Sequence, residues 1–276
     1  MKRIQPGRSG GNRSTKLGAA LLVISIVLYV FLYAPIAVVM LHSFNRAKHG
    51  GAWQGFTTDW YHALLHNEVA LHATGTTLAL AAMSTAVSTL LGASLALGLQ
   101  REKFFGQRFA EWTLQGVMVV PDIVMAIGLL LFYAVVRQWL GGFEPGLLTM
   151  TLAHVTFQIP FVTLVVRARL AGLDPSLAEA ARDLGATRAQ TFHHITLPLL
   201  GPGILAGGLL AFTLSLDDFV VSFFTTGPGA TTLPILIYSS VKRGLSPDIH
   251  ALSTLLVLMS VVATTAVMLL QRRRTS

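Results

Sequence analysis

Three carboxylates interrupt apolar stretches of this sequence. Asp122 directly follows Pro121, and Asp217 and Asp218 form an adjacent pair with no Lys or Arg between residues 189 and 241. If these stretches span a bilayer, each charge costs about 2.5–3.5 kcal/mol even on insertion scales, so retained charges usually have a task. Three unpaired acids along one path predict a cationic substrate. The alternatives are that the acids pair with Arg or Lys of another subunit, or that they cap helices.

A second informative pattern is a short helix with its own start and stop signals. Asp174 suits the N-cap, and Pro175 suits the first helical position, where its missing N–H costs nothing. Gly185 supplies a left-handed stop. Between these signals lies a narrow apolar stripe with helical spacing, formed by Leu177, Ala180, Ala181 and Leu184.

The loop that contains this helix, residues 173–198, continues with a second short helix. Thr187 and Gln190 have capping-box spacing, and Phe192 and Ile195 follow them. The first helix could lie on lipid headgroups, as many amphipathic helices do. Its stripe is built largely from alanine, which anchors poorly in lipid and suits close docking in a protein groove. We therefore favour docking on a protein partner.

The composition indicates a membrane protein. Of the 276 residues 53% are hydrophobic and only 12% are charged, and the mean hydropathy is +0.64. A soluble domain carries roughly 25% charged residues. The net charge of +8 does not indicate a nucleic-acid partner, because the basic residues flank apolar stretches and do not cluster with aromatic residues. The absence of cysteine excludes disulfides and thiolate chemistry.

The elements that must position these residues are about six transmembrane helices, because about 20 apolar residues cross the hydrocarbon core. The predicted spans are about 17–41, 71–99, 112–136, 147–166, 199–224 and 250–270. With the N-terminus inside, fifteen of the 20 Lys and Arg lie on the inner side, which places both termini in the cytoplasm. Residues 1–16 are predicted to be a disordered cytoplasmic tail, 17–271 a single transmembrane domain in contact with membrane lipid, and 272–276 a second cytoplasmic tail.

One spaced pattern in the loop resembles the EAA motif of the permease subunits of bacterial ABC importers: Glu179-Ala180-Ala181, Gly185, then Ile195-x-Leu197-Pro198. The resemblance implies an all-α polytopic membrane protein with the type I ABC importer permease fold. It also implies that the loop forms a coupling helix that docks on an ATP-hydrolysing subunit. The matching coupling positions are Glu179, Ala180, Ala181 and Gly185.

The energy source follows from the same resemblance. The chain has no G-x-x-x-x-G-K-[ST] phosphate loop. ATP and Mg would therefore be used by a separate ATP-binding cassette ATPase dimer. This chain is expected to be a transport subunit and not an enzyme, with no catalytic residue, bound cofactor or metal of its own.

Further segments resemble the spermidine/putrescine branch of these permeases, namely Phe212 to Val221, Pro121 to Val124, Trp53 to Tyr61, and Gly227 to Pro234. In that branch, the matching positions implicated in substrate passage are Trp60, Asp122, Ser215, Asp217 and Asp218. The resemblance implies a multi-pass protein of the bacterial inner membrane that forms half of a polyamine path, with a sister permease subunit and a periplasmic polyamine-binding protein. Some relatives carry an acid where Arg188 stands, so no role is transferred to Arg188.

Three other functions share some of these sequence features. Related permeases with the same docking loop carry other solutes, such as ferric iron. An ion-coupled secondary transporter would use buried acids but would need no docking helix. A membrane-embedded enzyme would need a nucleophile–base pair or metal ligands, and His154 stands alone in its span. We expect His154 and Gln158 to form interhelical hydrogen bonds, and we expect close helix packing at Gly75, Gly92, Gly128, Gly207 and Gly208.

Overall fold

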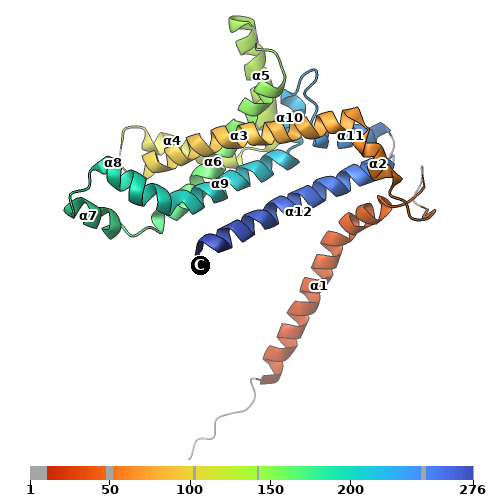
Figure 1. Ribbon diagram of the computed structural model, residues 1–276, viewed down its shortest axis with the longest axis horizontal. Coiled ribbons are helices and arrows are strands. Elements are labelled where there is room, and N and C mark those ends of the chain that lie inside the picture. Colours follow the sequence, from red (N-terminus) through yellow and green to blue (C-terminus); the bar gives the residue numbers. More distant parts are fainter. Residues whose placement is uncertain (1–10, 48–51, 102–103, 142, 244–246, 276) are drawn as a thin grey trace, which may run out of the picture.

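The computed structural model of the chain describes residues 11–47, 52–101, 104–141, 143–243 and 247–275 (Figure 1). Across these ranges the chain is helical, and the one β contact is an isolated bridge between Asn45 and Phe56. The elements are α1 (Gly11–His42), α2 (Asp59–Leu65), α3 (Glu68–Arg101), α4 (Gln107–Val119), α5 (Asp122–Leu140), α6 (Leu147–Ala171), α7 (Ser176–Asp183), α8 (Arg188–Thr191), a π-helical turn η1 (Phe192–Thr196), α9 (Leu197–Asp217), α10 (Val220–Thr225), α11 (Leu233–Arg243) and α12 (Pro247–Thr275). The predicted all-α class is confirmed.

Five helical stretches in the described part of the chain are long and apolar enough to cross a membrane. They are Leu21–His42, Glu68–Gln100, Asp122–Leu140, Leu147–Ala171 and Arg188–Asp217. α12 covers the sixth predicted span as one helix, but its described apolar portion, Asp248–Val262, is shorter than these five. Helices therefore occur at all six predicted spans, although two of the spans are divided.

The centre of the bundle is formed by α3, α6 and α9, which make the most extensive contacts with one another. Figure 1 shows these helices running side by side, with α12 next to α9. Small side chains line their contact: Ala93, Ala96 and Ala211 pack with Val162 and Val166. Small residues let helix backbones approach closely in a membrane, where apolar side chains gain little by leaving lipid.

The prediction of a single third span, 112–136, is wrong. α4 ends at Val119, Val120 and Pro121 are extended, and α5 begins at Asp122. Proline lacks an N–H and disfavours the helical conformation of the residue before it, so the helix cannot pass through this point. Figure 1 shows α5 turning away from α4. Asp122 consequently lies at the beginning of a helix and not in the middle of one.

The fifth predicted span, 199–224, is also divided. α9 ends at Asp217, Asp218 has extended backbone dihedral angles, and α10 begins at Val220. α10 then packs against α5 and α6, whereas α9 packs against α3 and α6. The break therefore redirects the chain from one side of α6 to another.

The first and last helices extend into the segments that were predicted to be cytoplasmic tails. α1 starts at Gly11, so residues 11–16 are helical, and α12 continues through residues 272–275. Residues 1–10 and Ser276, which complete those predicted tails, lie outside the described residues. α1 leaves the bundle and contacts mainly α12 (Figure 1). Its apolar stretch is exposed along its whole length, as a helix surrounded by lipid or by another subunit would be.

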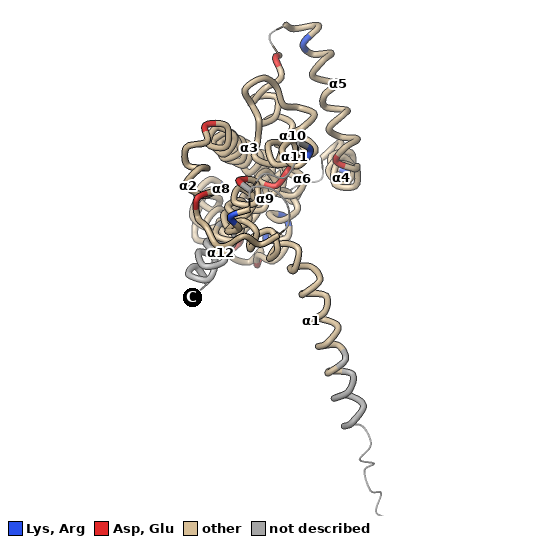
Figure 2. The backbone as a smooth tube through the Cα atoms, turned by 90° about the vertical axis from the view of Figure 1, so that its right-hand side faces the viewer, with Lys and Arg blue, Asp and Glu red and all other residues tan. Residues whose placement is uncertain are grey.

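Charged residues are rare along the helices of the bundle. Figure 2 shows long uncharged lengths of tube, with most of the coloured segments at helix ends and in connections. Two ion pairs hold such ends: Arg167 of α6 lies 3.1 Å from Glu111 of α4, and Arg137 lies 3.2 Å from Glu144 across the connection between α5 and α6. Arg167 and Glu111 are partly buried, so this pair fixes α4 against the end of α6.

Glycine permits the closest helix contacts at only some of the predicted positions. A Cβ at Gly92 would lie 2.7 Å from Val162 Cβ, and one at Gly208 would lie 2.9 Å from Thr89 Oγ1. Nothing lies within 4 Å of a Cβ at Gly75 or Gly128. A Cβ at Gly207 would also be close, 3.2 Å from Val162 Cγ1. Close packing is therefore confirmed at positions 92, 207 and 208 and is wrong at positions 75 and 128.

We predict that Gly92→Val destabilises the protein by about 1–3 kcal/mol, the usual cost of overpacking a core. The new side chain would force α3 away from α6 at Val162. Thermal unfolding of the purified protein in detergent measures this effect. Gly75→Val is the matched control, because it places the same β-branched residue in the same helix where there is space. Equal melting temperatures for the two variants would contradict this packing.

Candidate functional site

The break between α9 and α10 is held by the carboxylate of Asp218. Its Oδ1 accepts a hydrogen bond from the backbone N–H of Val221 at 3.2 Å, and its Oδ2 accepts one from the N–H of Ser222 at 2.7 Å. These are N–H groups of the first turn of α10 that have no partner within the helix. A negative charge at a helix N-terminus is also favoured by the helix dipole. Asp218 therefore caps α10.

The same carboxylate contacts a histidine in the centre of the protein. His154 Nε2 lies 3.3 Å from Asp218 Oδ2, and the imidazole is completely buried while the carboxylate is 10% exposed. His154 Nε2 also lies 3.0 Å from Ser222 Oγ, and its Nδ1 lies 2.8 Å from Ser215 Oγ. An ionised carboxylate only accepts hydrogen bonds, so Nε2 carries a proton, and in the neutral form of the imidazole Nδ1 then accepts from the serine. His154 thus joins α6 to both sides of the break.

This contact belongs to a longer buried network. Gln158 Nε2 donates to Ser84 Oγ at 3.2 Å, and Ser84 Oγ donates to Ser215 Oγ at 3.3 Å. With Ser215 donating to His154 and His154 donating to Asp218, every donor points toward the carboxylate. The network links α3, α6, α9 and α10, so the expectation of interhelical hydrogen bonds for His154 and Gln158 is confirmed. Hydrogen bonds between buried side chains of different helices favour one arrangement of those helices, although Gln158 Oε1 has no partner among the described residues.

The network changes the interpretation of two predicted site residues. Asp218 is not an unpaired acid, because it pairs with His154 of its own chain and caps α10. Helix capping was one of the two alternatives given above, whereas pairing with a cation of another subunit was the other. Ser215 is buried at 2% exposure and bonded on two sides. In this conformation both side chains position the break and neither faces an open path.

The other two predicted path acids, Asp217 and Asp122, have exposed side chains that could contact a substrate. Asp217 is exposed, and Asp122 is exposed at the start of α5. Neither carboxylate makes a hydrogen bond or ion pair with another of the described side chains. Both stand where a helix is interrupted, at Pro121 and at Asp218, and α10 packs directly against α5. The two interruptions therefore each present an exposed carboxylate in a largely uncharged bundle, one at the end of α9 and one at the start of α5.

Trp60 lies in a different part of the protein. Its indole Nε1 donates to the carbonyl of Asn45 at 2.8 Å, which fixes the loop before α2. The ring packs against a buried cluster that includes Leu64, Leu233 and Leu252. In the described part of the chain it makes no hydrogen bond or ring contact with the segment around Asp217. The structure thus brings Ser215, Asp217 and Asp218 together and leaves Trp60 apart.

The helix at the opposite end of the bundle, α7, has the predicted boundaries. Asp174 Oδ1 accepts the N–H of Ser176 at 2.9 Å, and this bond lowers the pKa of the Asp174 carboxyl. Gly185 has φ +87° and donates to Arg182 O at 2.9 Å, while Ala186 donates to Ala181 O at 3.0 Å. These two bonds form a Schellman motif, which requires the left-handed conformation that glycine adopts without strain. The capping box of Thr187 and Gln190 is also present.

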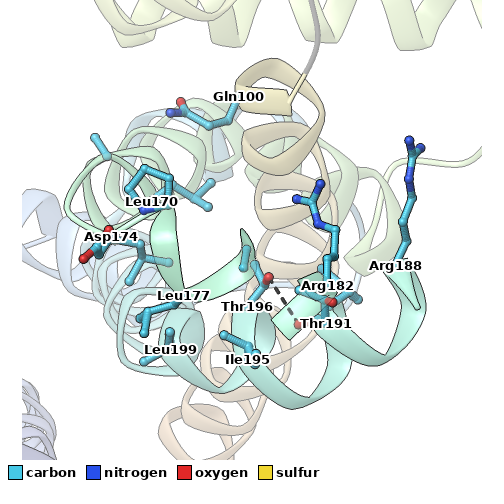
Figure 3. Close-up of a pocket in the computed structure, with 15 residues that line it drawn as sticks. Gln100, Leu170, Asp174, Leu177, Arg182, Arg188, Thr191, Ile195, Thr196 and Leu199 are labelled. Atoms are coloured by element: carbon cyan, nitrogen blue, oxygen red, sulfur yellow. Dashed lines mark hydrogen bonds between the residues drawn. The ribbon is translucent and has the colours of Figure 1, made fainter. Parts of the chain in front are cut away.

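The predicted coupling residues face outward. Glu179 and Ala180 are exposed and Ala181 is half-buried, while Leu184 is 90% exposed. Beside them lies an open pocket of about 630 Å³ between α7, the end of α6 and the start of α9. Figure 3 shows Arg182 and Arg188 projecting in the same direction at its edge. An exposed apolar tip next to two cations is a surface suited to a protein partner.

Residues 88–274 match the family of binding-protein-dependent transport system inner membrane components. The chain is 43% identical over 248 residues to the spermidine/putrescine transport system permease protein PotC of Escherichia coli, covering 90% of this chain and 92% of that protein. It is 42% identical over 237 residues to the putrescine transport system permease protein PotI of Escherichia coli, covering 85% and 84%. The chain belongs to this permease family and is located in the inner membrane.

Solved structures support the fold. A chain of a bacterial ABC transporter that imports the acidic polysaccharide alginate has a TM-score of 0.75 and 21% identity, covering 96% of this chain and 98% of that chain. A chain of the MetNI methionine ABC transporter has a TM-score of 0.61 and 18% identity, covering 79% and 99%. The type I importer permease fold, expected from the loop motif, is therefore confirmed.

We predict that Asp218→Asn lowers the stability of the protein by about 1–3 kcal/mol, because it weakens charge-assisted hydrogen bonds to α10 and to His154. Asp217→Asn is the matched control, since its carboxylate has no such partners. Thermal unfolding in detergent compares the two variants. If Asp217→Asn proved as destabilising as Asp218→Asn, the assignment of the cap to Asp218 would be wrong.

Proposed function

We propose that this chain forms half of the membrane path of an ATP-driven importer of polyamines. The observation that carries the proposal is that Asp122 and Asp217 are exposed at two interruptions of a largely apolar bundle and that neither carboxylate has a partner among the described side chains. A polyamine carries several ammonium groups, and carboxylates without internal partners can balance them as they pass. The named substrates of the similar PotC and PotI permeases have this chemistry.

The path begins at the outer mouth in this proposal. A separate periplasmic binding protein delivers the polyamine, and Asp217 receives one ammonium group while Asp122 provides the next contact. Trp60, in the first turn of α2, offers an aromatic surface in the outer segment. Asp218, Ser215 and His154 hold the break in position and thereby set where the Asp217 carboxylate points. A sister permease subunit completes the other half of the path.

In this proposal, the ATPase that drives transport binds at the opposite end of the bundle, at α7. An ATP-binding cassette ATPase dimer docks on α7 and the exposed positions Glu179, Ala180 and Leu184. Closure of the ATPase dimer around ATP and Mg moves α7, and the continuous segment α8–η1–α9 connects that movement to the break at Asp218. The chain thus transmits force and lines the path, while hydrolysis belongs to the partner.

We predict that Asp217→Asn and Asp122→Asn each reduce spermidine uptake at least tenfold while the assembly stays intact, because each removes a charge that balances an ammonium group. Uptake of radiolabelled spermidine by cells that carry the full transporter measures the loss. Glu68→Gln, an exposed acid at the start of α3 with no place in the proposed path, is the matched control. Uptake that survives both aspartate substitutions would contradict the path.

We predict that Gly185→Val detaches the ATPase from the membrane subunits, because a β-branched residue at φ +87° costs about 1–3 kcal/mol and removes the Schellman end of α7. Copurification of the ATPase with this chain is the measurement. Gly55→Val carries the same kind of strain, at φ +116°, on the other side of the membrane in the predicted topology. A stoichiometric ATPase on the Gly185→Val complex would refute the docking assignment.

A further inference from the structure

A group of aromatic side chains follows the two adjacent acids. Phe219 lies between Asp218 and α10, Phe223 lies in α10, and Tyr238 lies in α11. The ring centroids of Phe219 and Tyr238 are 4.5 Å apart, those of Phe219 and Phe223 are 5.3 Å apart, and those of Phe223 and Tyr238 are 6.3 Å apart. Three rings from two helices therefore form one group, named the aromatic site below.

The aromatic site is open to its surroundings. Phe223 is 45% exposed and Tyr238 is 39% exposed, although both rings contact other rings of the group. Rings that served only to hold α10 against α11 would be expected to bury these faces. Exposed aromatic faces that converge from two elements can receive a cation, because each face carries negative electrostatic potential.

A cation already lies on one of these faces. The ammonium of Lys242 is 4.8 Å from the centroid of the Tyr238 ring, one helical turn along α11. Lys242 forms no ion pair with the described acidic residues. Its side chain is a four-carbon stem that ends in a primary ammonium. The ring thus holds a primary alkylammonium, which is the chemical group at each end of a polyamine.

An exposed acidic residue, Asp217, lies near Phe219 along the chain. Asp217 is two residues from Phe219, so their Cα atoms are at most ~7 Å apart. The carboxylate is exposed and has no partner among the described side chains. A carboxylate beside aromatic faces suits an ammonium group on a methylene chain, since the charge is balanced on one side and the chain and cation are covered by rings on the other.

We propose that Phe219, Phe223 and Tyr238 form a binding site for a primary alkylammonium group of the cargo, and that the ammonium of Lys242 occupies this site when cargo is absent. The inference rests on the proposed function and extends it from carboxylates to a specific aromatic subsite. Cargo displaces Lys242 from Tyr238, and Lys242 returns when the cargo moves on. Tyr238 therefore contributes to the affinity for cargo, and Lys242 competes with it.

The test uses the complete transporter in proteoliposomes with its binding protein, and measures the initial rate of ATP-driven uptake against the concentration of spermidine-loaded binding protein. Tyr238→Leu should raise KM about two- to fivefold with little change in maximal rate, which is the range for a cation–π contact at an exposed site. Tyr238→Phe keeps the ring face and should retain the wild-type KM. Lys242→Gln removes the competitor and should lower KM.

Two results would overturn the aromatic site. One is an unchanged KM in both Tyr238→Leu and Lys242→Gln while wild-type uptake is normal, which leaves the proposed function standing. The other is a raised KM in Lys242→Gln, which would make the lysine a structural support. Because Lys242 is exposed, its variant remains informative even if Tyr238→Leu does not assemble. A wild-type transporter that imports no polyamine would overturn the proposed function and the aromatic site together.

Discussion

A helix that stops inside a membrane leaves backbone N–H and carbonyl groups that water cannot satisfy, and the protein must supply their partners. This constraint governs the break between α9 and α10. Asp218 accepts hydrogen bonds from two N–H groups of α10. His154 connects the carboxylate to α6, and the hydrogen bonds of Ser215 and Ser84 extend this connection to α9 and α3. One carboxylate therefore supplies the acceptors for two N–H groups of α10 at the point where the chain leaves the axis of α9.

At the break, the two adjacent acids Asp217 and Asp218 have different environments. Asp218 is turned inward and stabilises the break, whereas Asp217 is exposed and has no partner among the described side chains. The second interruption, at Pro121, has the same result by a different route, because proline ends α4 and Asp122 begins α5. In the proposed function these two free carboxylates are the charged points of the path. The proposed coupling surface on α7 lies near the other end of α9, so in the proposed function one long helix connects it to the proposed path.

Much of this architecture could be predicted from the sequence because the signals are local. Hydropathy located helices at all six predicted spans, two of which the structure divides. The capping residues around Asp174, Gly185 and Thr187 gave the boundaries of the helices in the loop. The EAA pattern identified the family and its fold. These signals depend on a few neighbouring residues and need no knowledge of tertiary contacts.

The remaining features depend on tertiary contacts. Nothing in the local sequence shows that His154 meets Asp218, since 63 intervening residues separate them, or that Gly92 packs closely while Gly75 does not. Hydropathy also cannot see a break of two residues, so α9 and α10 were predicted as one helix. A histidine and a glutamine in one apolar span were the available signal for the network, and they indicated hydrogen bonding without its partners. The convergence of Phe219 and Tyr238 is likewise a consequence of how α10 and α11 pack.

The central claim is that the contact between His154 and Asp218 holds the break. A double-mutant cycle measures it most directly, with the free energy of unfolding in detergent determined for the wild type, His154→Gln, Asp218→Asn and the double variant. The account predicts that the two substitutions are not additive, with a coupling energy of about 1–3 kcal/mol between the side chains. Additive effects would show that the two side chains act independently and would contradict the account.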